Sequence, residues 1–157
     1  MGTDVGLRFK STRGRGGVVE NIFIDNINMI DIPNDVLTMD LYYAVNDSPE
    51  TPIPDVNEET PVFRNIYISN VLCRGAGRAV YFNGLPEMPL KNILIKNMTV
   101  TNAKKGIVIN QASQVNMENI KVEDSEIPAI QIENATGVII NGKEYKKDSG
   151  KMLLSGN

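Results

Sequence analysis

Apolar and polar residues alternate in short runs along this chain, and the runs share a repeated phrase. An Asn-Ile-x-Ile-x pattern begins at Asn21, Asn65 and Asn92, and a weaker copy begins at Asn119. Alternation of this kind places both aliphatic residues on one face, which is typical of a β-strand. The last three copies begin 27 residues apart, and the first gap is 44 residues. A fixed period of this size predicts a solenoid in which each repeat buries its apolar face against its neighbours.

Further short apolar runs lie between the copies and predict additional strands. The asparagines that flank each phrase suit tight corners, because Asn tolerates the left-handed backbone region, and asparagines at the same corner of successive rungs can stack into a hydrogen-bonded ladder. The Leu-x-x-Leu-x-Leu spacing of a leucine-rich repeat is absent. The pattern therefore predicts an all-β fold, a parallel β-helix. The expected additional strands are 6–10, 36–41, 79–82, 106–109, 129–132 and 138–140.

The 17 residues that lengthen the first gap fall mostly in 46–62, a segment rich in proline and acidic residues. Proline cannot continue a sheet, so this segment is expected to be a loop insertion that projects from one rung. We expect residues 1–145 to form one β-helix domain with this insertion. Residues 146–157 are expected to be a polar tail or a cap on the last coil.

The composition of the chain excludes several kinds of catalytic and binding site but does not itself indicate a function. The chain has 157 residues, a hydrophobic content of 41% and a net charge of -3, which suit an ordinary acidic domain with a core. It contains one cysteine, Cys73, and no histidine, so catalysis by Ser-His-Asp or Cys-His groups within it is excluded and a transition-metal site is not expected. No apolar run is long enough for a membrane span, and the first residues lack the features of a signal peptide. We therefore expect no metal, no cofactor and no membrane partner.

A basic cluster stands out on this acidic chain at residues 8–15, Arg-Phe-Lys-Ser-Thr-Arg-Gly-Arg. Arg8 and Lys10 are two apart on a predicted strand, so both side chains project from one face while Leu7 and Phe9 share the other. Two aligned cations followed by a glycine-rich turn with free backbone N–H groups could bind an anion. A solvated edge strand protected by its charges is the alternative explanation. Nucleic acid is not expected as a partner, because no aromatic platform is interleaved with the cations.

The residues around this cluster, Gly6-Leu7-Arg8-Phe9-Lys10-Ser11 and Gly14-Arg15-Gly16-Gly17-Val18-Val19-Glu20-Asn21-Ile22, resemble the C-terminal part of polygalacturonase-type glycoside hydrolases, which degrade pectin. The resemblance covers most of residues 4–145 and implies a right-handed parallel β-helix, here of about five rungs and truncated at its N-terminal end.

The same resemblance assigns substrate-binding roles. Arg8 and Lys10 match the family's Arg-x-Lys motif, which binds the galacturonate carboxylate beside the scissile bond. A tyrosine one rung later completes the family's substrate contacts, and it corresponds to Tyr43, with Tyr42 as the neighbouring candidate. The pattern of residues 38–43, Thr-Met-Asp-Leu-Tyr-Tyr, resembles the bacterial branch in particular.

The family's catalytic motifs, Asn-Thr-Asp, Asp-Asp and Gly-His-Gly, are absent from this sequence. We assign no catalytic role to Asp25, Asp31, Asp35 or Asp40, which are better explained as turn or outward-facing residues. The expectation is therefore the C-terminal fragment of an inverting hydrolase of galacturonate-containing polysaccharide, which binds substrate but is inactive alone.

A non-catalytic β-helix for carbohydrate binding or assembly, as in an adhesin or a phage fibre, is the alternative function. The resemblance implies an extracellular or periplasmic location and an acidic polysaccharide as the partner. An open N-terminal end of the helix would also favour self-association, because it would leave strand edges unpaired and apolar side chains uncovered.

Overall fold

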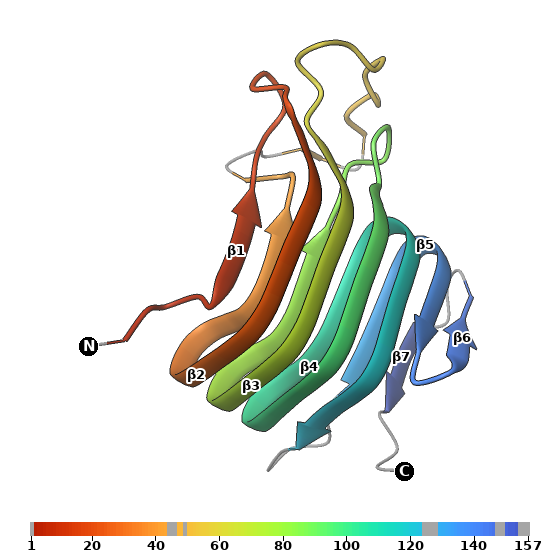
Figure 1. Ribbon diagram of the computed structural model, residues 1–157. Helices are drawn as coiled ribbons and strands as arrows, with labels where there is room; N and C mark the ends of the chain where they lie inside the picture. Colours follow the sequence, from red (N-terminus) through yellow and green to blue (C-terminus); the bar gives the residue numbers. More distant parts are fainter. Residues whose placement is uncertain (1, 44–46, 49, 124–128, 147–149, 154–157) are drawn as a thin grey trace.

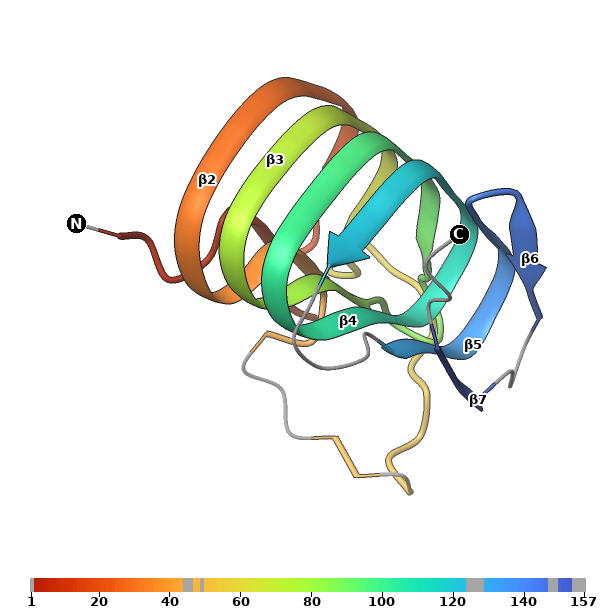
Figure 2. The same cartoon turned by 90° about the horizontal axis from the view of Figure 1, so that it is seen from below.

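The protein is a solenoid of β-strands that winds along one axis (Figures 1 and 2). The computed structural model describes residues 2–43, 47–48, 50–123, 129–146 and 150–153. Several of its strands are long because each bends around more than one side of a coil. The seven strands are β1 (Leu7–Lys10), β2 (Val18–Asp40), β3 (Val62–Asn83), β4 (Leu90–Glu123), β5 (Ala129–Ile140), β6 (Lys143–Tyr145) and β7 (Gly150–Leu153).

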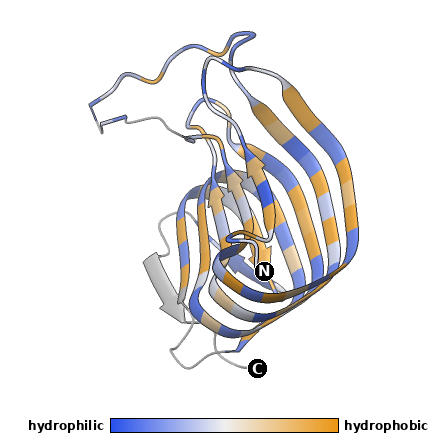
Figure 3. Ribbon diagram, turned by 90° about the vertical axis from the view of Figure 1, so that its left-hand side faces the viewer, coloured by the Kyte–Doolittle hydropathy of each residue, from blue (hydrophilic) through white to orange (hydrophobic). Residues whose placement is uncertain are grey.

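Successive coils pair in parallel, which confirms the predicted parallel β-helix. Strand β1 pairs with the end of β2, and β2, β3, β4 and β5 then pair in chain order. At one position of the coil this register stacks Leu37 on Val80, Ile107 and Ile130. All four side chains are buried, so the core is a column of aliphatic residues inside the coil. Figure 3 shows the corresponding alternation of apolar and polar positions along the strands.

The coil length is not constant, and this corrects the predicted 27-residue period. Asn92 lies on Asn65, 27 residues earlier, and donates a hydrogen bond of 2.8 Å to it. Asn119, however, lies on Asn97, 22 residues earlier, with a bond of 2.9 Å. The fourth copy of the phrase therefore begins one corner later than the other three. The second 27-residue gap therefore equals the first by coincidence, because the later coil is shorter and the fourth copy begins at the next corner.

Asparagine forms most of the corners, as predicted. Thirteen described residues other than glycine have a positive φ, and ten of them are asparagines. Stacked asparagines form the predicted ladders, of which one runs from Asn70 through Asn97 to Asn119 with bonds of 3.1 and 2.9 Å. The corners in these ladders thus form side-chain hydrogen bonds between coils. They also adopt a backbone conformation that costs most other residues free energy. The ten asparagines are Asn21, Asn26, Asn65, Asn70, Asn92, Asn97, Asn102, Asn119, Asn134 and Asn141.

The segment between β2 and β3 contains no strand among its described residues and projects from the solenoid (Figure 1). Its end is anchored to the glycine-rich turn before β2, because the N–H groups of Gly14 and Gly16 donate to the carbonyl oxygen of Glu59 at 3.0 and 2.9 Å. A Cβ on Gly16 would lie 2.1 Å from the carbonyl oxygen of Glu58. Gly16 is therefore needed for close packing of the loop. The expectation that these N–H groups are free to bind an anion is wrong for Gly14 and Gly16.

The far end of the solenoid is closed by two antiparallel strands. Strand β6 pairs with residues 138–140 of β5, and β7 pairs with residues 129–132. The backbone of residues 150–153 thus lies against the last coil, whereas the remaining tail residues beyond 146 fall outside the described residues. Within the described chain there is no helix that could cross a membrane.

Candidate functional site

A hollow on the solenoid surface brings three of the four predicted site residues together. It is formed where β1, the end of β2 and the end of β3 run side by side. Arg8, Lys10 and Tyr43 all line it, as do the acidic residues Asp35 and Asp40. The remaining lining residues are Val5, Phe9, Thr38, Arg78 and Tyr81.

The orientation of Arg8 and Lys10 follows from the alternation along β1. Both side chains are exposed, whereas Leu7 and Phe9 are half-buried and pack against the core. Phe9 contacts Phe63 edge to face, with ring centroids 6.3 Å apart. Arg8 has an ion pair with Asp4 at 3.6 Å, but both side chains are largely exposed, so this pair contributes little to stability. The two cations therefore face the hollow on a strand that the core holds in place.

Tyr43 lies beside Lys10, although it is 33 residues later in the chain. Its N–H donates to the carbonyl oxygen of Ser11 at 3.2 Å, which fixes the backbone next to the end of β1. The Lys10 Nζ lies 4.3 Å from the centre of the Tyr43 ring, within the range of a cation–π contact. Tyr43 is 43% exposed, so part of the residue remains accessible to a ligand.

Tyr42 points to a different neighbour. Its hydroxyl accepts a bond of 3.4 Å from Arg13, whose guanidinium carbon lies 5.1 Å from the centre of the tyrosine ring. Arg13 is itself held by Glu87, through bonds of 2.5 and 2.8 Å, and it contacts Asp47. Tyr42 thus belongs to a network that ties the 12–17 turn to two loops, and it lines a neighbouring hollow rather than the one with Arg8.

Residues of the next two coils form the floor and far wall of the hollow, and sequence reasoning did not identify them. The register stacks Arg8 on Thr38 and Thr38 on Tyr81. Thr38 is a buried polar residue, and burial raises the pKa of Tyr81, with the nearby Asp40 carboxylate acting in the same direction. Arg78 lies over the Tyr81 ring at 4.2 Å. Only alignment of the coils residue by residue could have predicted these neighbours.

The acidic residues near the hollow accept hydrogen bonds from the fold. Asp35 accepts from Arg78 Nε at 2.6 Å. One oxygen of Asp40 accepts from the N–H of Tyr42 at 2.9 Å and from the amide of Asn83 at 3.2 Å. Both carboxylates therefore have structural partners.

The other two acids discussed above lie at other places on the coil. Hydrogen bonds from Ser69 and Asn70 lower the pKa of the exposed Asp25, and Asp31 occupies a corner with a φ of 53°. Within the residues that the structure describes, no three acidic, cysteine or histidine side chains gather as metal ligands would.

The fold and the hollow together define a parallel β-helix with a basic, tyrosine-lined site on its surface. A family model described as "Glycosyl hydrolases family 28" matches residues 1–112, which is more than half of the chain. The chain belongs to this family, which confirms the resemblance to polygalacturonase-type hydrolases. Searches among curated proteins and among solved structures returned no match.

Proposed function

We propose that this chain carries the carboxylate-binding site of a glycoside hydrolase that acts on galacturonate-containing polysaccharide. Arg8 and Lys10 bind the carboxylate of one sugar, and Tyr43 contacts the ring of that sugar. The observation that supports this most directly is the convergence of these three side chains on one hollow. A carboxylate suits this site because guanidinium and ammonium groups donate charge-assisted hydrogen bonds to it. The position of Tyr43 beside Lys10 favours it over Tyr42 as the sugar contact.

We place substrate binding rather than proton transfer in this chain. An inverting hydrolase needs an acid and a base whose carboxyl groups are about 6.5 to 9.5 Å apart across the scissile bond. Asp35 and Asp40 lie in the hollow, but Asp35 accepts a hydrogen bond from Arg78, and Asp40 accepts from the N–H of Tyr42 and from Asn83. The acid and the base of the intact enzyme are thus proposed to come from outside this chain. An extracellular or periplasmic location would suit a substrate of the plant cell wall.

The test is the affinity of the chain for oligogalacturonates, measured by calorimetry beside the same oligomers with methyl-esterified carboxyl groups. Arg8→Ala should weaken binding of the charged oligomers about tenfold or more, because a hydrogen bond to a charged group contributes about 1.5 to 3 kcal/mol. Binding of the esterified oligomers should change far less. Arg15→Ala removes one charge from an exposed residue of the neighbouring turn and is the matched control. Equal losses on both ligands, or reducing sugar released during the titration, would contradict the proposed role.

A non-catalytic carbohydrate-binding or assembly module remains the alternative, and the same titration addresses it. A module that binds neutral glycans would hold the esterified oligomers at least as well as the charged ones. We also propose that the coil formed by β2 takes part in self-association, because its inward residues Ile22, Ile24 and Ile27 are only half-buried.

A further inference from the structure

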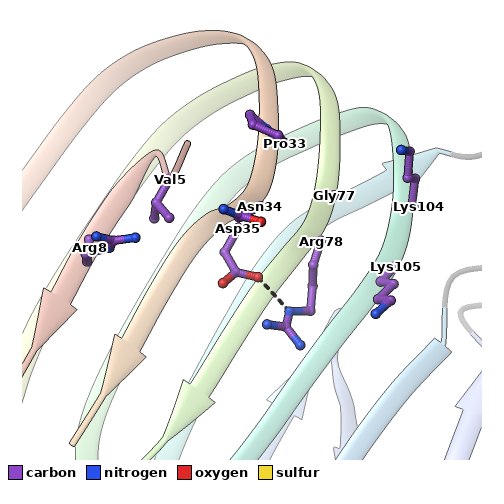
Figure 4. A pocket seen from close by; sticks show the side chains of 9 residues that line it. All are labelled: Val5, Arg8, Pro33, Asn34, Asp35, Gly77, Arg78, Lys104 and Lys105. Atoms are coloured by element: carbon purple, nitrogen blue, oxygen red, sulfur yellow. Dashed lines mark hydrogen bonds and ion pairs between the residues drawn. The ribbon is translucent and has the colours of Figure 1, made fainter. Parts of the chain in front are cut away.

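A second hollow adjoins the first and is more basic. Figure 4 shows it from close by, with Arg78 and Lys105 on neighbouring strands and Arg8 on the other side. It shares Val5, Arg8, Asp35 and Arg78 with the first hollow. The residues it adds are Pro33, Asn34, Gly77, Lys104 and Lys105.

The coil register builds this second hollow. Asp35, Arg78 and Lys105 occupy the same position on three successive coils, so the strand spacing of about 4.8 Å separates each from the next. A register shift between Ile32 and Asp35 adds one residue to β2 at this point. Bulges of this kind redirect side chains and are frequent beside binding sites. Gly77 permits the close approach, because a Cβ there would lie 2.1 Å from the carbonyl oxygen of Pro33.

The fold balances only part of the charge of this hollow, because Arg8 has an ion pair with Asp4 and Arg78 has one with Asp35. The Nε–H of Arg78 donates a hydrogen bond to Asp35, while the terminal nitrogens of the guanidinium extend past that carboxylate (Figure 4). Lys104 and Lys105 are both exposed, and neither has an ion pair within the described part of the chain. Four cations, those of Arg8, Arg78, Lys104 and Lys105, thus surround one acidic residue on a chain whose net charge is -3.

Protection of a sheet edge does not explain these cations. Arg78 lies on β3, which at this position pairs with β2 on one side and, through Lys105, with β4 on the other. Their register places two like charges directly opposite each other on adjacent strands, an arrangement that destabilises a sheet. An anion between them would remove this repulsion.

We propose that Arg78, Lys104 and Lys105 form a second subsite, which binds the carboxylate of another uronate residue on the same polysaccharide chain. This rests on the function proposed above, because Arg8 and Lys10 hold the first uronate. From β1 to β4 the polymer would cross three strand spacings, roughly 14 Å, a length that spans several sugar residues. The second subsite therefore selects for polymers with many free carboxylates and adds affinity only when the oligomer is long enough to reach it.

The test is the dependence of affinity on oligomer length, measured with oligogalacturonates of increasing size. The double variant K104Q/K105Q alters two exposed side chains without ion pairs, so its fold should be preserved, and thermal unfolding checks this. Wild-type affinity should rise with length, and the variant should lose about tenfold on the longest oligomers and little on the shortest. Lys121→Gln, an exposed residue on another side of the coil, should bind as the wild type does.

The outcomes separate this inference from the function on which it rests. A variant with the same length dependence as the wild type would overturn the second subsite, while a loss on all lengths in Arg8→Ala would still support the first. No binding of any oligogalacturonate by the wild type would contradict the proposed function itself. Single-stranded DNA is the competing polyanion. If the wild type bound DNA more tightly than oligogalacturonate, and K104Q/K105Q abolished the binding of DNA, the ligand of this hollow would be a phosphate, and the proposal would be overturned.

Discussion

At the scale of single residues, the asparagine corners carry two separable contributions to stability. Asn97 has a φ of 55°, donates to Asn70 and accepts from Asn119. A side chain other than Asn, Asp or Gly in this backbone region costs about 1 to 2 kcal/mol. The ladder bonds add a smaller amount, because their net contribution in an exposed position is at the low end of about 0.5 to 1.5 kcal/mol each.

Substitution at Asn97 can measure the two contributions. Asn97→Ala should lower the free energy of unfolding by about 2 kcal/mol, because it loses both the ladder bonds and the tolerance of a positive φ. Asn97→Gly loses the bonds but keeps the backbone tolerance, so it should be more stable than the alanine variant. Urea denaturation of the three proteins gives the comparison. If the alanine variant were the more stable of the two, the ladder and not the corner conformation would explain the choice of asparagine.

The roles of single residues were easier to predict from the sequence than the arrangement of the strands. Asparagine was expected at left-handed corners and in ladders, and the structure has both. The orientation of Arg8 and Lys10 also followed from alternation along one strand. The glycine amides were misjudged because their acceptor, the carbonyl oxygen of Glu59, is more than forty residues away in the chain. A contact over that separation leaves no trace in a local sequence pattern.

At the scale of elements, the link between the 12–17 turn and the loop before β4 depends on one arginine. The Glu87 side chain is 4% exposed, and its charge is balanced by Arg13. Hydrogen bonds from Arg13 lower the pKa of Glu87 and outweigh the opposite effect of burial. Tyr42, which contacts the same arginine, directly precedes the proposed sugar contact Tyr43. The Arg13 network therefore positions this side of the site.

The pH dependence of stability should report this link. Because the folded pKa of Glu87 is below the ordinary value of about 4.3, the unfolded chain binds the proton more readily. The stabilisation is thus fully present above about pH 4.3 and is lost as the pH falls through the lower folded value. Glu87→Gln should cost about 2 kcal/mol at pH 7, and the difference from the wild type should shrink toward pH 3. Unfolding in urea at several pH values tests this, and a constant difference would contradict it.

The arrangement of elements was only partly predictable. Every expected strand is present, because short alternating apolar runs signal strands whatever their neighbours are. The register between coils was not predictable, since a coil of 22 residues and a bulge after Ile32 shift it without a marker in the repeated phrase. For this reason sequence reasoning found the cations of β1 but missed Arg78 and Lys105, which approach the site only through that register.

At the scale of the whole molecule, the two ends of the solenoid differ. The last coil is covered by β6 and β7, which pair with it in the antiparallel sense. At the other end, Ile24 of β2 is half-buried, although its register partner Ile68 on β3 is 2% exposed. Residues 18–30 of β2 pair with β3, and no other described strand pairs with them. An edge of this length with apolar side chains beside it is a template for pairing with another chain.

We therefore expect the chain to associate through this end as its concentration rises, because contact between two such ends would bury the half-exposed isoleucines and pair the free backbone groups. Sedimentation over a wide concentration range should show a mass that increases with concentration. Ile24→Lys should suppress the increase, because it places a charge within the contact. Phe23→Lys is the matched control, since Phe23 is the outward neighbour of Ile24 and stacks on Tyr67 at 4.9 Å on the outer face. A mass that stays monomeric at all concentrations would contradict the expectation, and association abolished by the Phe23 variant alone would move the contact to the outer aromatic face.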